Sequence, residues 1–164
     1  MSDYAFQPVR GNWRTVAFNT ASAATFGKGA LVALNTARTL QEATVGSEKI
    51  LGISLHRSVD SFPAGCVLVA VPMDSSAVFT AAIETDVTAS LISVGESYTF
   101  EKSGNTQRID VDSQASAYVE LVGPLTASGV LDTTLISTTS RVEAVFLTGI
   151  RGFASAASLL TLAP

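Results

Sequence analysis

The side chains of this sequence that could carry out chemistry are few and scattered. A nucleophilic triad needs an activated Ser or Cys, a base and an orienting carboxylate. The chain has one histidine, His56, with Asp60 four residues later, but it contains no Gly-x-Ser-x-Gly elbow. Arg57 follows His56 directly and would lower its basicity if the two side chains approach each other. We therefore interpret His56 as a polar loop residue, expect no catalytic residues and predict that the protein is not an enzyme.

Metal and cofactor sites also lack their usual ligands. Zinc sites need clusters of Cys and His, and the chain has one residue of each type. Asp110 and Asp112 would share one face of a strand, as would Glu84 and Asp86, but this alternation is equally typical of a solvated strand face. The glycines of residues 27–29 lack the spacing of a phosphate-binding loop and precede a strand pattern. We therefore expect neither a metal site nor a cofactor.

The chain carries little charge for a protein without a membrane-spanning pattern. Charged residues make up 15% of it, against about 25% in ordinary soluble domains, whereas the hydrophobic fraction of 47% is ordinary. The deficit therefore lies in the residues that normally coat a surface, and we expect the protein to bury much of its outside against its own copies or a larger assembly. The net charge is −4 and the basic residues are spread thinly, so nucleic acid is not an expected partner.

No membrane association is expected either. Residues 1–4 lack the basic start and apolar stretch of a signal peptide. The apolar stretch over residues 153–164 is too short to span a bilayer. We expect a protein that is made and used without crossing a membrane.

Period-two alternation recurs along the chain, and long helical patterns are nearly absent. About nine short strands separated by turn residues predict an all-β fold, a compact β-barrel or β-sandwich with extended terminal arms. One or two helical turns are expected over residues 86–94, with Asp86 as the cap and Gly95 as the stop. The expected strands are 13–18, 30–34, 50–55, 66–71, 77–84, 96–100, 108–111, 117–122 and 142–148.

The termini differ from the middle of the chain. Residues 1–12 show no strand pattern and are interpreted as an N-terminal arm, residues 13–148 as the β domain, and residues 149–164 as a C-terminal strand or arm. The C-terminal segment has no charge after Arg151, so it is either a last strand or an arm that packs on a neighbouring subunit. Because aromatic and large apolar side chains dominate interfaces, the candidate interface residues are Tyr4, Phe6, Trp13, Phe153, Leu159 and Leu160.

Five stretches follow one another in a familiar order. They are GKGALVAL at 27–34, ILGIS at 50–54, PAGCVLVAV at 63–71, VGESYTF at 94–100 and RVEAVF at 141–146. This succession of strands and turns resembles the small capsid decoration, or cement, proteins of tailed bacteriophages. The resemblance covers residues 27–148.

The resemblance implies a non-enzymatic structural protein of the virion. Such a protein is made in the host cytoplasm, binds the outer surface of the phage capsid and stabilises it by bridging subunits of the major capsid protein, commonly as a homotrimer. The expected partners are therefore the major capsid protein and further copies of the chain itself. The alternative is a β-barrel recognition module that binds glycans in a phage fibre or a host-surface protein.

Overall fold

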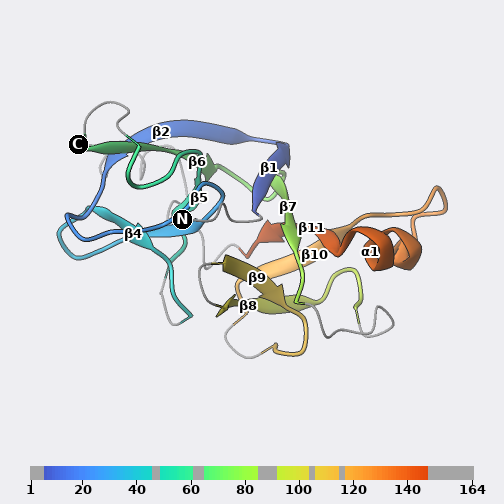
Figure 1. The fold of residues 1–164 in the computed structure, drawn as a ribbon. Coiled ribbons are helices and arrows are strands. Elements are labelled where there is room, and N and C mark those ends of the chain that lie inside the picture. Colours follow the sequence, from blue (N-terminus) through green and yellow to red (C-terminus); the bar gives the residue numbers. More distant parts are fainter. Residues whose placement is uncertain are drawn as a thin grey trace.

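The computed structural model describes residues 6–45, 49–60, 65–84, 92–103, 106–114 and 117–147. These residues form eleven strands and one short helix, which confirms the all-β prediction. The strands belong to two antiparallel sheets, which lie side by side along an elongated molecule (Figure 1).

The first sheet has six strands and carries the helix at its end. Its strand order is β1 (Gln7–Arg10), β7 (Val78–Ala82), β11 (Arg141–Phe146), β10 (Val119–Gly123), β8 (Ser97–Ser103) and β9 (Thr106–Asp110). The helix α1 (Thr133–Thr139) lies between β10 and β11 in the chain. The second sheet has five strands in the order β2 (Trp13–Asn19), β6 (Cys66–Pro72), β5 (Gly52–Ser54), β3 (Leu31–Leu34) and β4 (Leu40–Glu42).

Both sheets curl strongly. The residue after β2, Thr20, forms a parallel bridge with Leu40 of β4, and Ile83 after β7 forms one with Ile109 of β9. Each bridge is isolated, so over the residues that the structure describes neither sheet closes into a continuous hydrogen-bonded barrel. Of the two expected forms, two packed sheets describe the molecule better than a closed barrel.

The main core lies between the two sheets. Phe79 and Phe100 of the six-stranded sheet and Leu31 and Ile53 of the five-stranded sheet belong to one buried cluster. A second cluster, which includes Val32, fills the other side of the five-stranded sheet. Because successive side chains of a strand point to opposite faces, β3 is buried on both sides, and this explains its unbroken apolar sequence.

Polar groups also join the two sheets, along a line that we call the seam. The side chain of Gln107 in β9 is fully buried there. Its Oε1 accepts a hydrogen bond from the Leu31 N–H (2.7 Å) and its Nε2 donates to the Ala43 carbonyl (2.9 Å). Nearby, Lys102 of β8 forms an ion pair with Glu42 of β4 (2.5 Å). The seam therefore fixes how one sheet sits on the other.

Three elements were not predicted from the sequence. Strand β4 lies in a stretch to which no strand was assigned, and it pairs with β3. Residues 7–10, assigned to the N-terminal arm, form strand β1, which pairs with β7 and so belongs to the six-stranded sheet. Helix α1 consists of TTLISTT, and the Asp132 side chain caps it by accepting from the Leu135 N–H (2.9 Å). The expected helical turns over 86–94 fall mostly outside the described residues, and residues 92–95 form a turn rather than a helix.

Candidate functional site: an apolar lobe and its groove

The described residues around His56 build a turn. His56 lies half-buried in the loop between β5 and β6. The Asp60 carboxylate accepts from the Arg57 N–H (3.0 Å), and the Ser58 hydroxyl accepts from the Phe26 N–H (3.0 Å). The acid and the hydroxyl nearest to His56 in the sequence are therefore engaged with backbone groups.

The carboxylate of Glu84, which follows β7, also has a structural role. Glu84 Oε1 accepts from the backbone N–H groups of Val111 (2.8 Å) and Asp112 (3.1 Å), which ties the turn after β9 to the chain that follows β7. Burial raises the pKa of Glu84 above its ordinary value, although these two hydrogen bonds act in the opposite direction. Within the described ranges, no group of three or more His, Cys, Asp or Glu side chains could hold a metal ion.

The candidate interface residues fall into two groups. Phe6 is 2% exposed and packs on Phe79, with 5.7 Å between ring centroids, so its ring belongs to the core of its own chain. Trp13 is half-buried against the same core, and its Nε1 donates to the Arg10 carbonyl (2.9 Å). The other four, Tyr4, Phe153, Leu159 and Leu160, lie outside the described residues.

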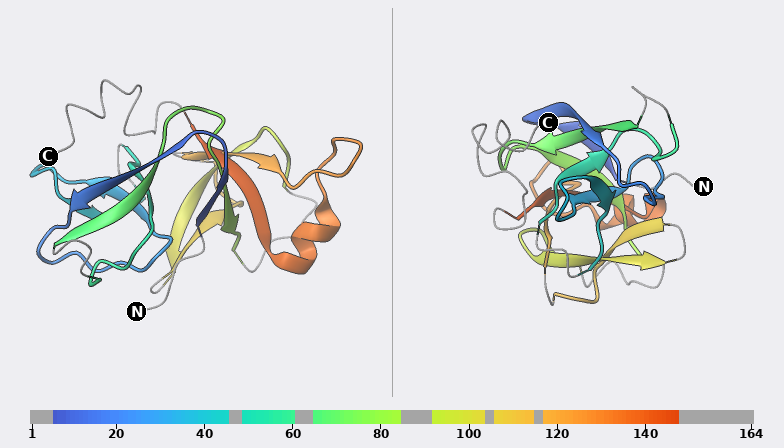
Figure 2. Two further views of the ribbon diagram at one scale, coloured as in Figure 1. Left: turned by 90° about the horizontal axis from the view of Figure 1, so that it is seen from above. Right: turned by 90° about the vertical axis from the view of Figure 1, so that its left-hand side faces the viewer.

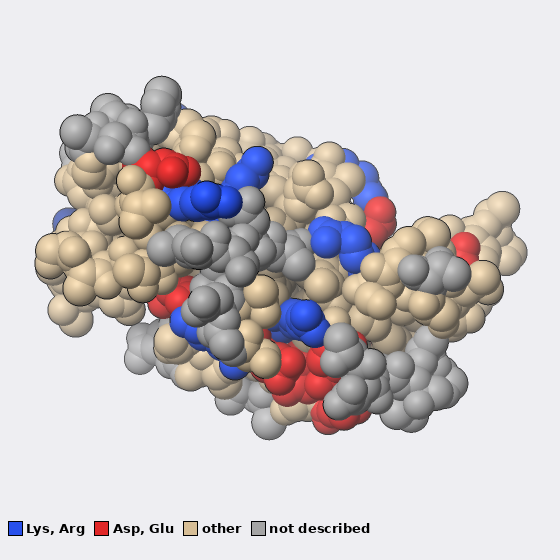
Figure 3. Space-filling view, viewed as in Figure 1, with Lys and Arg blue, Asp and Glu red and all other residues tan. Residues whose placement is uncertain are grey.

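A projecting segment between β10 and β11 carries several exposed apolar side chains. We call this segment, residues 123–140, the apolar lobe; it comprises a tight loop and helix α1, and it extends from one end of the molecule (Figures 1 and 2). Its one charged residue is Asp132. Accordingly, the lobe is almost entirely tan in the space-filling view, whereas charged side chains are distributed over the body (Figure 3).

Local hydrogen bonds hold the lobe in shape. The Thr126 N–H donates to the Val130 carbonyl (2.7 Å), and the Asp132 N–H donates to the Pro124 carbonyl (2.8 Å). Ile136 is buried and anchors α1 to the main core. The backbone of the lobe is therefore fixed at both ends, and its remaining apolar side chains point outward from a defined frame.

Four large apolar side chains on and beside the lobe stay in solvent. Leu125, Val130 and Leu135 of the lobe and Val94 of the facing turn are between 43% and 63% exposed. Scattered exposed apolar residues are normal in a soluble protein, but several on and beside one uncharged projection make it the candidate interaction surface. Sequence reasoning missed these residues, although the low charge of 123–140 was visible.

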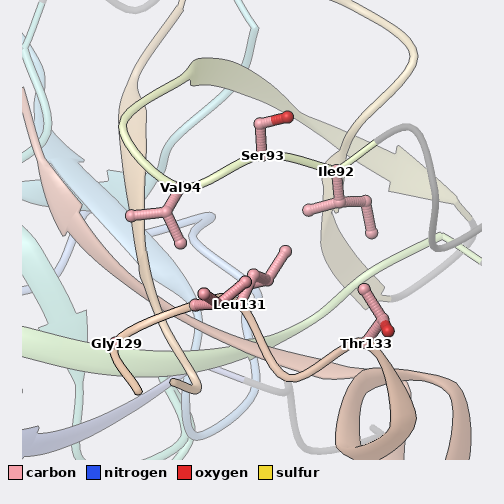
Figure 4. A pocket seen from close by; sticks show the side chains of 7 residues that line it. Ile92, Ser93, Val94, Gly129, Leu131 and Thr133 are labelled. Atoms are coloured by element: carbon pink, nitrogen blue, oxygen red, sulfur yellow. The ribbon is translucent and has the colours of Figure 1, made fainter. Parts of the chain in front are cut away.

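Val94 and Val130 lie on opposite walls of a groove of about 460 Å³. One wall is the turn that contains Ile92, Ser93 and Val94, and the other wall belongs to the lobe (Figure 4). The residues of the second wall are Gly129, Val130, Leu131 and Thr133. The described residues that line the groove contribute two hydroxyl groups and no charged side chain, acid, base or thiol, so this lining suits an apolar, uncharged segment that excludes water.

Among the described elements, no helix combines the length and the apolar character that a membrane crossing requires. No family model, curated protein or solved structure matches this chain.

Proposed function

We propose that this protein is a non-enzymatic structural component of a phage virion that binds the outside of the capsid and stabilises it by bridging major capsid subunits. The observation that carries this proposal is the combination of a rigid two-sheet body with an uncharged, projecting apolar lobe. The resemblance of residues 27–148 to decoration proteins of tailed bacteriophages supports the same function. Its partners would be the major capsid protein and further copies of itself, as a homotrimer on the outer surface of the virion.

A bridging protein needs a body that does not deform under load. Internal pressure pushes shell subunits apart, so a clamp resists only if its own parts stay together. The seam supplies this property, because Gln107 and the Lys102–Glu42 ion pair join the two sheets in addition to the shared core. The clamp then works by buried area and by several contacts acting together, which raises avidity without any catalytic group.

A glycan-binding module is the second candidate. The volume of the groove falls within the range of small-molecule sites, and Ser93 and Thr133 contribute hydroxyl groups to its lining. Among the described residues that line the groove, none is an aromatic on which a sugar ring could stack, however, and Trp13 is half-buried on another part of the surface. We therefore favour the bridging function.

Co-sedimentation with shells assembled from the major capsid protein of the same genome tests the proposal. We expect saturable binding at a fixed ratio of copies to capsid subunits, and this ratio would identify the symmetry position that is occupied. The same preparation is then incubated with a broad glycan panel. Absence of binding to mature shells would overturn the bridging function, and saturable glycan binding would replace it with the second candidate.

A further inference from the structure

We propose that the groove receives the C-terminal segment, residues 149–164, of a second copy of this chain. This segment, which we call the arm, would extend from one copy and bind in the groove of a neighbouring copy. This inference deepens the proposed function and rests on it for its purpose, but it concerns self-association alone and is tested without shells.

The receiving surface is apolar, and its described lining residues carry no charge that would reject an apolar segment. The groove runs between the turn 92–95 and the lobe, and its exposed valines, Val94 and Val130, stand on opposite walls. Asp132, the one charge of the lobe, is engaged as the cap of α1. A segment that enters the groove therefore removes apolar surface from water without desolvating a free charge.

The chain contains a segment with the matching composition. After Arg151 the sequence reads GFASAASLLTLAP, which combines Phe153, Leu159 and Leu160 with small residues and carries no charge. Small residues allow close approach of a backbone, and the large side chains, which also include Leu162, can fill a groove of this size. Together, the lobe and residues 152–164 hold one charged residue, and this shared lack of charge is the complementarity on which the proposal depends.

The topology favours a groove on a neighbouring copy over the groove of the same chain. Strand β11 begins at Arg141, directly after the lobe, and runs away from it to Phe146. The chain leaves the sheet at Leu147, whose N–H donates to the Tyr118 carbonyl at the end of β10 opposite to the lobe. A six-residue strand is about 20 Å long, so the segment would have to retrace that whole length to reach its own groove.

The distance along the chain limits how the first part of the segment could reach the groove of its own chain. From Leu147 to Phe153 an extended chain spans at most about 20 Å, which is about the length of β11. Phe153, the first large apolar side chain of the segment, would therefore reach the lobe of its own chain only if these residues were fully extended. A copy whose lobe approaches the exit of β11 would instead receive the segment directly. Such an arm-to-groove contact is heterologous, and it forms a closed ring when the rotation between copies closes, which agrees with the proposed homotrimer.

Self-association of the full chain, measured by sedimentation equilibrium without shells, is the first test. Val130→Asp places a charge on the groove wall and is expected to weaken association by at least about tenfold, because the arm would then have to desolvate an unpaired carboxylate. Leu160→Asp is expected to do the same from the arm side. The double variant should self-associate about as weakly as either single variant, because both changes remove the same contact.

Val59→Asp is the matched control, since Val59 is an equally exposed valine (66%) in a loop of the other sheet. It should leave association unchanged. Circular dichroism checks that every variant keeps the fold, which is expected because Val130 and Val59 are both exposed. A wild-type chain that stays monomeric at all concentrations, or a Val130→Asp variant that associates like the wild type, would overturn the proposal.

Cross-linking identifies which copy supplies the arm. In a Cys66→Ser background, a Val130→Cys chain is mixed with a Leu160→Cys chain under mild oxidation. We expect a disulfide-linked dimer of the two different chains. A chain that carries both changes and cross-links only within itself would show that the segment folds back, which overturns exchange between copies. Because neither readout involves shells, failure of this inference is distinguishable from failure of capsid binding.

Discussion

Replacing the buried glutamine of the seam tests how much the seam contributes to the stability of the two-sheet body. The change is Gln107→Leu, which keeps a side chain of similar size in a fully buried position of β9. The variant loses the hydrogen bond from the Leu31 N–H (2.7 Å) and the one to the Ala43 carbonyl (2.9 Å). Both backbone groups then remain buried without these partners.

The magnitude follows from these two groups. An unsatisfied buried donor or acceptor costs about 1–3 kcal/mol, and part of this is recovered because the amide of Gln107 no longer has to be desolvated. We therefore expect the free energy of unfolding to fall by about 2–4 kcal/mol, out of a total of about 5–15 kcal/mol for a domain. For a chain of this length, the melting temperature should fall by about 5–15 °C.

Equilibrium unfolding in urea measures the effect, and Gln41→Leu is the control. Gln41 is an exposed glutamine of β4, close in the sequence to the same seam, and its replacement should change the free energy of unfolding by less than about 0.5 kcal/mol. Wild type and both variants should unfold in one transition, because the main core contains residues of both sheets. Equal free energies of unfolding for Gln107→Leu and Gln41→Leu would refute a stabilising role of the Gln107 hydrogen bonds. Two separate transitions in the wild type would refute the expectation that the two sheets unfold together.

Three further changes test other parts of the body. Gly52→Ala should lower the melting temperature strongly, because the added Cβ would lie 2.1 Å from the Ala70 carbonyl oxygen; an unchanged melting curve would show that β5 and β6 can separate there. Ile136→Ala should cost about 2–5 kcal/mol and the adjacent, exposed Leu135→Ala less than about 0.5 kcal/mol, as measured by urea unfolding; similar losses would contradict the anchoring of α1. The pKa of Glu84 is raised in the folded protein, so the folded protein binds a proton at this carboxylate more tightly than the unfolded chain does. Ionisation of Glu84 therefore lowers the free energy of unfolding as the pH rises through the folded-state pKa. The stability of Glu84→Gln relative to wild type should therefore decrease as pH is lowered from 7 to 4, and a difference that does not change with pH would contradict the shift.

Strands with local alternation and clear turn residues could be predicted from the sequence. The expected strand at 13–18 corresponds to β2 (Trp13–Asn19), and the one at 66–71 corresponds to β6 (Cys66–Pro72). The expected strands at 96–100 and 108–111 correspond to β8 and β9, which pair with each other. In each case, apolar spacing and flanking turn residues act within a short window, so tertiary context adds little.

Strand β4 was missed although it pairs locally with β3, because three residues are too few to show an alternation. The other two missed elements depend on contacts that a local pattern does not show. Strand β1 has four residues, one of them Pro8, and it is a strand because it pairs with β7 about seventy residues later. Helix α1 is rich in β-branched residues, which favour strands, but the Asp132 cap and the burial of Ile136 decide its conformation. Local patterns carry neither kind of information.

The candidate site shows the same limit at the level of single side chains. The sequence of 123–140 reveals a stretch almost without charge, but not which of its apolar residues are buried. Ile136 is buried in the core, while Leu135 beside it and Val130 are exposed. Conversely, Phe6 was expected at an interface because aromatic rings anchor interfaces, and its ring instead packs on Phe79 within the chain. Only the fold separates these cases.

The fold shows that the lobe is one of the regions where the chain lacks charged residues. Charged side chains are visible over the body, whereas the lobe is nearly bare of them (Figure 3). Charges on the body help to keep it hydrated. Residues 15–27 of the body carry no charge either, but the lobe combines a lack of charge with projection from the body (Figure 1) and with exposed Leu125 and Val130, which favours a defined contact there. Charge placement, rather than total charge, is therefore the property that would make this chain an assembly component instead of an insoluble one.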